Sequence, residues 1–255
     1  MKDYIMQTED LISIITPSYN SSCFICDTIN SVINQTYQNW EMLIIDDCSK
    51  DNSVEMIQKY VDMDSRIKLL QNNENRGAAE TRNNGLKVAK GRFIAFLDSD
   101  DIWYKDKLKI QYSIMKKNNY PITFTSYDVV DEKGNKKGQI KSVYCISYKE
   151  YLKNTIIGMS TSMINKNIVG EFSFYNIKTR QDTYLWMTLL KKGFLAFGIN
   201  EVLAAYTIRK ESISANKFKA AKRVWYLYYN LEKLGFFRSF YYFVNYIFNA
   251  TKKRI

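Results

Sequence analysis

Three carboxylates within four positions are the residues of this chain best suited to chemistry. Asp98, Asp100 and Asp101 follow the apolar run Phe93-Ile94-Ala95-Phe96-Leu97. Carboxylates this close repel one another, so a positive charge is expected among them. Mg²⁺ and Mn²⁺ prefer oxygen ligands, and Mg²⁺ commonly uses one or two carboxylates together with substrate phosphates. The stretch therefore predicts a metal–diphosphate site, with a plain polar turn after a buried strand as the alternative.

Two earlier apolar runs also end in polar side chains. Residues 11–15 lead into 16–20, and residues 40–45 lead into 46–49. Helical patterns at 21–35, 53–60 and 78–89, with a further strand at 67–70, alternate with these runs. Such alternation is typical of a mostly parallel, doubly wound α/β sheet. Because these sheets bind ligands beyond the carboxyl ends of their strands, the three polar ends are expected to form one nucleotide–metal site.

The phosphate of this nucleotide must be held without glycine-rich loops. The turn after the first strand, Thr16-Pro17-Ser18-Tyr19-Asn20, contains no glycine, and no P-loop motif occurs in the chain. A dinucleotide site of the dehydrogenase kind needs such a turn. Metal and arginine are therefore expected to neutralise the diphosphate.

The second half has a mixed pattern, which is expected of an acceptor-side half packed on a nucleotide-binding half. Helical patterns occur at 106–118, at 148–153 and from residue 181. Strands are expected at 122–130 and 136–143, which would pair, and at 194–197 and 202–208. The polar residues Ser160, Thr161 and Ser162 lie on the acceptor side or form an ordinary turn.

The composition restricts the mechanism and the compartment. The chain has 255 residues, a net charge of +11 and no histidine, so a general base must be Asp, Glu or a perturbed Lys, Cys or Tyr. Its four cysteines, Cys23, Cys26, Cys48 and Cys145, suggest reduced thiols in the cytoplasm. Residues 1–10 are polar and do not resemble a secretory signal.

The C-terminal segment carries most of the positive charge. Residues 209–255 contain eleven Lys or Arg and two Glu, a net charge of +9, and twelve aromatic residues lie between 224 and 249. The apolar stretch 236–248 is too short to span a bilayer, which needs about 20 apolar residues. Aromatic and basic residues together favour a helix in a membrane interface. A helix pair covering the catalytic domain, a homodimer contact and a nucleic-acid-binding segment are the alternatives.

The ordered motifs resemble glycosyltransferase family 2, whose catalytic domain has the GT-A fold. The resemblance covers residues 11–213, and its motifs follow one another in the family's order. They are Thr16-Pro17-Ser18-Tyr19-Asn20, Asp46-Asp47-Cys48-Ser49, Asn75-Arg76-Gly77, Arg82-Asn83-Asn84-Gly85, Asp98-Ser99-Asp100-Asp101 and Gln181-Asp182-Thr183-Tyr184-Leu185-Trp186. It implies a catalytic domain at 1–213, divided into a nucleotide-sugar-binding half at 1–101 and an acceptor half at 102–213. The basic aromatic helical tail then occupies 214–255.

The resemblance also implies a role for each matching residue. The residues implied for nucleotide-sugar binding are Thr16, Pro17, Tyr19, Asp47, Arg76, Arg82, Asp98 and Ser99. Asp47 would bind uracil or ribose, and either Arg76 or Arg82 would face the base or the diphosphate. Asp100 would be the principal ligand of Mn²⁺ or Mg²⁺, and Asp182 the catalytic base.

Two departures from the family pattern concern charge. Gln181 stands where the family has Glu, and the downstream histidine is absent. The Gln-x-x-Arg-Trp motif of processive synthases is also missing, which implies one sugar per encounter.

The resemblance implies an inverting, metal-dependent transfer from a nucleotide-sugar, with UDP favoured, to a glycan or lipid-linked acceptor in surface polysaccharide synthesis. The cysteines and the basic aromatic tail place the enzyme in the cytoplasm at the inner membrane face. No nucleic-acid partner is expected, because the tail has no recognised nucleic-acid-binding motif; a non-catalytic nucleotide-sugar binder is the alternative.

Overall fold

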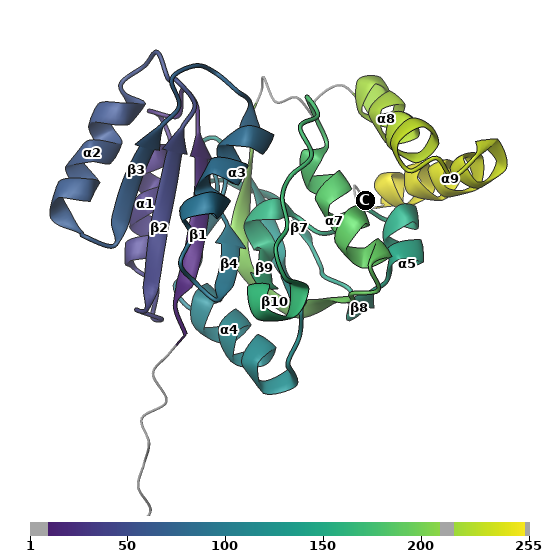
Figure 1. Cartoon of the computed structure of the whole chain (residues 1–255), viewed down its shortest axis with the longest axis horizontal. Coiled ribbons are helices and arrows are strands. Elements are labelled where there is room, and N and C mark those ends of the chain that lie inside the picture. Colours follow the sequence, from purple (N-terminus) through teal and green to yellow (C-terminus); the bar gives the residue numbers. More distant parts are fainter. Residues whose placement is uncertain (1–9, 210–216, 253–255) are drawn as a thin grey trace, which may run out of the picture.

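The computed structural model describes residues 10–209 and 217–252. Several predictions concern residues outside these ranges. They are the polar, non-secretory nature of residues 1–9, the end of the catalytic domain at residue 213, and the basic residues Lys253 and Arg254 of the tail. Within the described part, one mixed sheet forms the centre of the molecule, with helices on both faces (Figure 1).

The first half alternates strand and helix as the apolar pattern predicts. Its elements are β1 (Ile12–Ser18), α1 (Ile25–Ile33), β2 (Trp40–Asp46), α2 (Ser53–Met63), β3 (Ile67–Gln71), α3 (Ala78–Val88) and β4 (Phe93–Phe96). The strands lie in the order β3-β2-β1-β4, and every neighbouring pair is parallel. The predicted parallel, doubly wound arrangement is confirmed.

The second half extends the same sheet with both strand directions. Its elements are β5 (Ile102–Trp103), α4 (Lys107–Asn118), β6 (Ile122–Asp131), β7 (Lys136–Ile140), β8 (Cys145–Ile146), α5 (Tyr148–Lys153), the 3₁₀ turn η1 (Met159–Thr161), β9 (Ser162–Asn165), α6 (Lys166–Val169), α7 (Gln181–Lys191) and β10 (Ala196–Ile208). The order continues from β4 as β9-β6-β10-β5, with β9 antiparallel to both of its neighbours. The mixed half is thus confirmed.

The prediction of two strands at 194–197 and 202–208 was wrong, because β10 runs unbroken from Ala196 to Ile208. Its pairing with β6 shifts between Ile199 and Val202 and again before Ala204. The polar residues Asn200 and Glu201, which suggested a loop, lie at this irregularity. A strand can therefore continue through a polar interruption that resembles a turn in the sequence.

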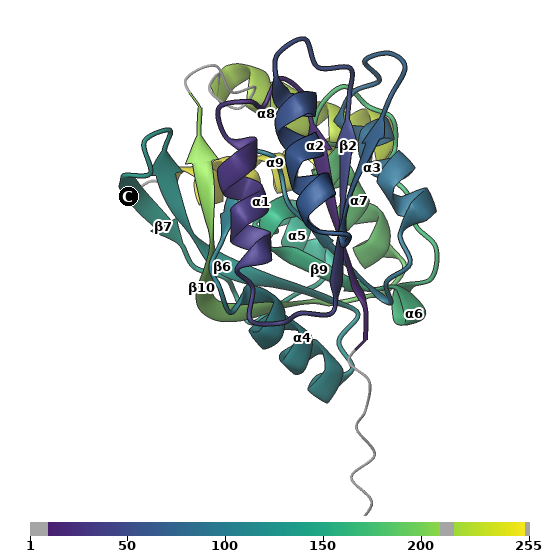
Figure 2. The same ribbon diagram turned by 90° about the vertical axis from the view of Figure 1, so that its left-hand side faces the viewer.

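The two faces of the sheet bury alternate residues of the same strands, as the pleat requires. Ile14 and Ile44 pack with α1, α2 and α4, whereas Ile15 and Ile45 pack with α3, α5, α7 and the C-terminal helices. Figure 2 shows α1 and α2 side by side on one face. Helix α3 approaches the other face closely: a Cβ on Gly85 would lie 2.7 Å from Ile45 Cδ1.

The C-terminal segment is helical, as predicted. It consists of α8 (Lys217–Tyr226), a π-helical turn (Leu227–Leu231) and α9 (Phe236–Lys252), at the end of the molecule opposite α2 (Figure 1). The Tyr228 hydroxyl donates to the Leu152 carbonyl at 2.5 Å, and Asn249 Nδ2 donates to the Lys153 carbonyl at 3.1 Å. The segment is therefore docked on α5.

Helix α9 buries one side and leaves large apolar side chains exposed on another. Ser239 is fully buried, whereas Phe237 is 86% exposed. The other exposed apolar residues of α9 are Phe236, Phe240, Tyr241, Val244, Ile247 and Phe248. From 237 onward these recur at three- and four-residue spacing, so they form one stripe. In the described part of the chain, no helix combines the length and apolar character that a membrane crossing requires.

Candidate active site

The carboxyl ends of β1, β2 and β4 lie next to one another at one edge of the sheet. Ser18 at the end of β1 pairs in register with Asp46 at the end of β2. The Asp47 backbone N–H donates to the Ser18 carbonyl at 2.8 Å, and the Leu97 N–H donates to the Ile15 carbonyl at 3.1 Å. The predicted meeting of the three polar ends is therefore observed.

The three carboxylates after β4 have different partners. Asp98 accepts from Arg82 Nη2 at 2.5 Å, and Asp100 lies 3.5 Å from Arg209 Nη1. Asp101 is buried and pairs with no cation among the described residues: its Oδ2 accepts from the Ser160 hydroxyl at 2.5 Å and its Oδ1 from the Thr207 N–H at 2.9 Å. The expected positive charge is thus supplied in part by two arginines.

Ser160 connects Asp101 to the acceptor side. Its hydroxyl also accepts from the Asp98 N–H at 3.0 Å, and its carbonyl accepts from Trp103 Nε1 at 2.6 Å. On the opposite side, Thr28 Oγ1 donates to the carbonyls of Ser99 and Asp101 at 3.1 and 2.9 Å. The loop 98–101 is therefore held by α1, η1 and β10, and Asp101 serves as its internal anchor.

The charge state of these carboxyls follows from burial and from one another. Burial, and then the charge of Asp98, raise the pKa of Asp100, although Arg209 opposes the rise. Burial, followed by the charges of Asp100 and Asp98, raises the pKa of Asp101 well above its usual range. A further cation near Asp98 and Asp100 would relieve this repulsion.

The residues of this loop fit a divalent cation that shares its coordination with a diphosphate. No group of three or more His, Cys, Asp or Glu that could hold an ion by itself occurs within residues 10–209 and 217–252. Asp98 and Asp100 nevertheless supply two neighbouring carboxylates, which is the hard-oxygen set that Mg²⁺ commonly combines with substrate phosphates. Asp101 is committed to Ser160 and Thr207 and is less suited to coordinate the ion.

Three of the other residues predicted to bind the nucleotide-sugar lie at the end of β1. Thr16 is fully buried, Pro17 is half-buried, and Tyr19, just beyond the strand, is 47% exposed. The Thr16 hydroxyl has no hydrogen-bond partner among the described residues. Asp47 is buried and accepts from the Arg76 and Gly77 N–H groups at 2.9 and 2.8 Å. These hydrogen bonds to Asp47 fix the loop at Arg76 and Gly77 that precedes α3, and neither of them involves a nucleotide.

The two candidate arginines lie in different surroundings. Arg82 is buried on α3, beside Asp98 and 5.5 Å from the Phe174 ring centroid. Arg76 is exposed and lies 3.4 Å from Glu74. The structure therefore places Arg82, and not Arg76, at the carboxylate loop.

Asp182 lies in the first turn of α7, after a residue with left-handed backbone, Arg180 (φ 64°). A cleft of about 200 Å³ includes both Asp98 and Asp182 in its wall, with Tyr127, Ser160 and Tyr206. The expected base and the carboxylate loop, which are 84 positions apart, thus share one cleft. Asp100 lines a separate cavity of about 210 Å³ with Asp27 and Lys133.

Sequence reasoning missed several residues of this region. Thr207 and Tyr206 come from the end of β10, Arg209 directly follows that strand, and Tyr127 comes from the middle of β6. None of them belongs to a local motif, because only the strand order brings β6 and β10 beside β9 and β4. The alternation of side chains along β10 predicts which of its residues lie on the same face of the sheet. It does not predict that these residues lie beside the carboxylates of the loop 98–101.

The chain resembles known proteins in sequence over nearly its full length. A model of the family described as Glycosyl transferase family 2 matches residues 13–181. The chain is 46% identical over 246 residues to the putative teichuronic acid biosynthesis glycosyltransferase TuaG of Bacillus subtilis, covering 96% of this chain and 98% of that protein. It is 41% identical over 249 residues to the UDP-Glc:alpha-D-GlcNAc-diphosphoundecaprenol beta-1,3-glucosyltransferase WfgD of Escherichia coli, covering 95% and 94%.

The fold is also similar to that of solved structures. S. aureus TarS 1-349 in complex with UDP-GlcNAc matches with a TM-score of 0.68 and 20% identity. The match covers 86% of this chain and 66% of that one, so this chain spans about two thirds of the TarS fragment. A similarity at this level of identity concerns the fold alone, and it confirms the predicted GT-A architecture.

Proposed function

The chain belongs to glycosyl transferase family 2, and we propose that it transfers one sugar from a UDP-sugar to a hydroxyl of a glycan or lipid-linked saccharide during cell-surface polysaccharide synthesis. The observation that carries this proposal is the cleft lined by both Asp98 and Asp182. One side offers groups suited to a sugar-diphosphate, and the other offers a carboxylate suited to activate an acceptor.

The donor would lie across the carboxyl ends of β1, β2 and β4. Thr16, Pro17 and Tyr19 would frame the base, and the Thr16 hydroxyl is a buried group that still needs a partner. Asp98 and Asp100 would hold Mg²⁺ or Mn²⁺, which when bound would neutralise the charge that builds on the departing diphosphate. The names of WfgD and of the TarS complex, which refer to UDP-Glc and UDP-GlcNAc, support a UDP-sugar.

The acceptor would be activated by Asp182. Its carboxylate takes the proton of the acceptor hydroxyl, whose oxygen then attacks the anomeric carbon from the face opposite the nucleotide. The bond between that carbon and the diphosphate oxygen breaks, so the configuration inverts. Gln181, the uncharged residue before Asp182 on α7, stands where the family has Glu.

Contact with the inner membrane face is the second part of the proposal. The stripe of α9 defined above presents aromatic side chains to solvent, and Arg238 lies on the same helix. The segment 209–255 has a net charge of +9, which complements an anionic lipid surface. An interfacial helix buries such a stripe below the headgroups and does not need to span the bilayer.

The direct test of the activity is a screen of sugar nucleotides with the purified chain. With Mn²⁺, at least one UDP-sugar should be hydrolysed slowly or transferred to an added saccharide. Binding of UDP-sugars without any turnover, over a broad panel of acceptors, would instead identify a non-catalytic nucleotide-sugar binder.

A further inference from the structure

A pocket outside the cleft lies between the loop that precedes α7 and helix α8. It has a volume of about 450 Å³, and its wall consists of Ile177, Lys178, Thr179, Lys222, Arg223, Tyr226 and Leu227. Three of these seven residues are cationic, none is acidic, and three are large and apolar. The catalytic roles assigned above do not use any of them.

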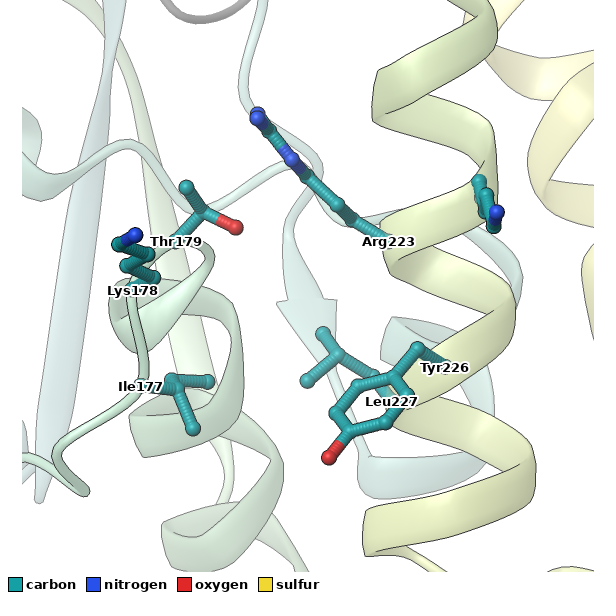
Figure 3. A pocket seen from close by; sticks show the side chains of 7 residues that line it. Ile177, Lys178, Thr179, Arg223, Tyr226 and Leu227 are labelled. Carbon is teal, nitrogen blue, oxygen red and sulfur yellow. The ribbon is translucent and has the colours of Figure 1, made fainter.

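The polar and apolar groups of the pocket are separated in space. Figure 3 shows Arg223 reaching from α8 toward Thr179, while Tyr226 and Leu227 face Ile177 below them. The pocket thus has one end with the Arg223 guanidinium and the Thr179 hydroxyl, and another end that is apolar. Such a division suits an amphiphile with an anionic head, because the head gains charge-assisted hydrogen bonds and the apolar part is removed from water.

The position of the pocket relates it to both the site and the tail. Thr179 is three residues before Asp182, so their Cα atoms lie at most about 11 Å apart. Arg180, in the same loop, donates from Nη2 to the Tyr246 hydroxyl of α9 at 3.2 Å. The loop therefore joins the base at the start of α7 to the helix that carries the exposed apolar stripe.

We infer that this pocket binds the diphosphate and the first apolar segment of a lipid-diphosphate-linked saccharide acceptor. The inference rests on the proposed function and specifies its acceptor. Lys178, Lys222 and Arg223 complement the diphosphate charge, and Ile177, Tyr226 and Leu227 contact the start of the lipid chain. The saccharide then extends from the diphosphate toward Asp182, while the rest of the lipid follows α9 into the membrane interface.

The test uses farnesyl diphosphate, a short prenyl diphosphate, in calorimetric titrations of the full chain. Saturating UDP and Mn²⁺ are present, so that the probe does not enter the donor site. Farnesyl diphosphate should bind at least tenfold more tightly than either inorganic pyrophosphate or farnesol. Equal binding of pyrophosphate, or competition between the probe and UDP for one site, would overturn the inference.

Variants separate the two ends of the pocket. Lys178→Gln with Arg223→Gln should weaken farnesyl diphosphate binding at least tenfold, whereas Lys109→Gln, an exposed lysine of α4, should not. Ile177→Ser should weaken binding of farnesyl diphosphate but not of pyrophosphate. Melting temperature and UDP affinity verify that each variant is folded, and unchanged probe affinity in all pocket variants would contradict the assignment.

Two further arms identify the source of the signal. Dihexanoylphosphatidylglycerol offers an anionic head on a different lipid, and equal affinity for it would indicate a general anionic-lipid surface and overturn the inference. Hydrolysis of a UDP-sugar without lipid tests the proposed function separately. Hydrolysis of the UDP-sugar without any binding of farnesyl diphosphate would support the proposed function but overturn the assignment of this acceptor subsite.

Discussion

Arg82 of α3 and Asp98 at the end of β4 form an ion pair of 2.5 Å, and only 6% of the Arg82 side chain is exposed. The pair joins the helix that carries one predicted nucleotide-binding motif to the loop that carries another. Asp98 also lines the cleft that has Asp182 in its wall.

Removing both members of this pair should cost less than the sum of the two single removals. Arg82→Ala leaves Asp98 without its cation and should lower the free energy of unfolding by about 3 kcal/mol. Arg82→Ala with Asp98→Ala should lower it by less than the sum of the single changes, because neither charge is then left unpaired. Urea unfolding of the four proteins measures the coupling, and strictly additive losses would show that the pair does not stabilise the fold.

Asp100 should make nucleotide binding depend on metal. In the unaltered protein, Mn²⁺ should increase the affinity for UDP, because a cation held by Asp98 and Asp100 would neutralise charge on the diphosphate. Asp100→Asn should reduce this increase at least tenfold, while Asp62→Asn, an exposed acid of α2, should leave it intact. Calorimetric titrations of UDP with and without Mn²⁺ measure this increase in affinity. If Mn²⁺ increases the UDP affinity of Asp100→Asn as much as that of the unaltered protein, Asp100 is not the principal metal ligand.

Asp51 should make stability depend on acid pH. Burial alone would raise the pKa of its carboxyl, but hydrogen bonds from Ser53 and Ser22 lower it from 3.8 to about 2. The lowered pKa contributes stability that is present above about pH 4 and is lost as the pH falls toward 2. The contribution is on the order of 1 kcal/mol because the group is partly exposed.

Asp51→Asn should remove this part of the pH dependence. The free energy of unfolding of both proteins at pH 5 and at pH 2.5 gives the stability that each loses on acidification. The variant should lose less stability than the unaltered protein between these values. Identical losses would assign the acid sensitivity to other carboxyls.

The α9 stripe should bind anionic vesicles. Full burial of a Phe side chain contributes about 1.5–3 kcal/mol, so Phe237→Ser with Phe240→Ser should reduce binding to phosphatidylglycerol vesicles at least tenfold. Tyr144→Ser is the matched control, since Tyr144 is 77% exposed but lies outside the tail. Flotation at physiological salt measures the binding. Retention on single-stranded nucleic acid, or concentration-dependent dimerisation without vesicle binding, would favour the other uses of the tail.

The sequence predicted the first half of the fold well, because each of its elements has a strong local signal. Buried strands such as β2 contain a run of consecutive apolar residues, here Met42 to Ile45, and the polar residues that follow mark the carboxyl edge. The location of Asp47 and Asp98 at the same edge of the sheet follows from the parallel direction of β2, β1 and β4.

The second half could be predicted less completely, since its site residues meet through long-range pairing. Strand β9 has only four residues and lies between β4 and β6, and no local pattern indicates this insertion. Arg209 reaches Asp100 because β10 continues through Asn200 and Glu201, where the sequence suggested a break. The position of Arg82, and not Arg76, at the carboxylate loop likewise depends on the packing of α3 beside that loop, which no local pattern indicates.

The measurement that tests the central claim most directly is the turnover of Asp182→Asn with a UDP-sugar and its acceptor. Removal of a general base typically costs about 10²–10⁴-fold in rate, so kcat should fall by that amount. The affinity for UDP and the melting temperature should stay unchanged, because Asp182 lies on α7 and not among the donor-binding strands. Near-normal turnover by Asp182→Asn would contradict the account.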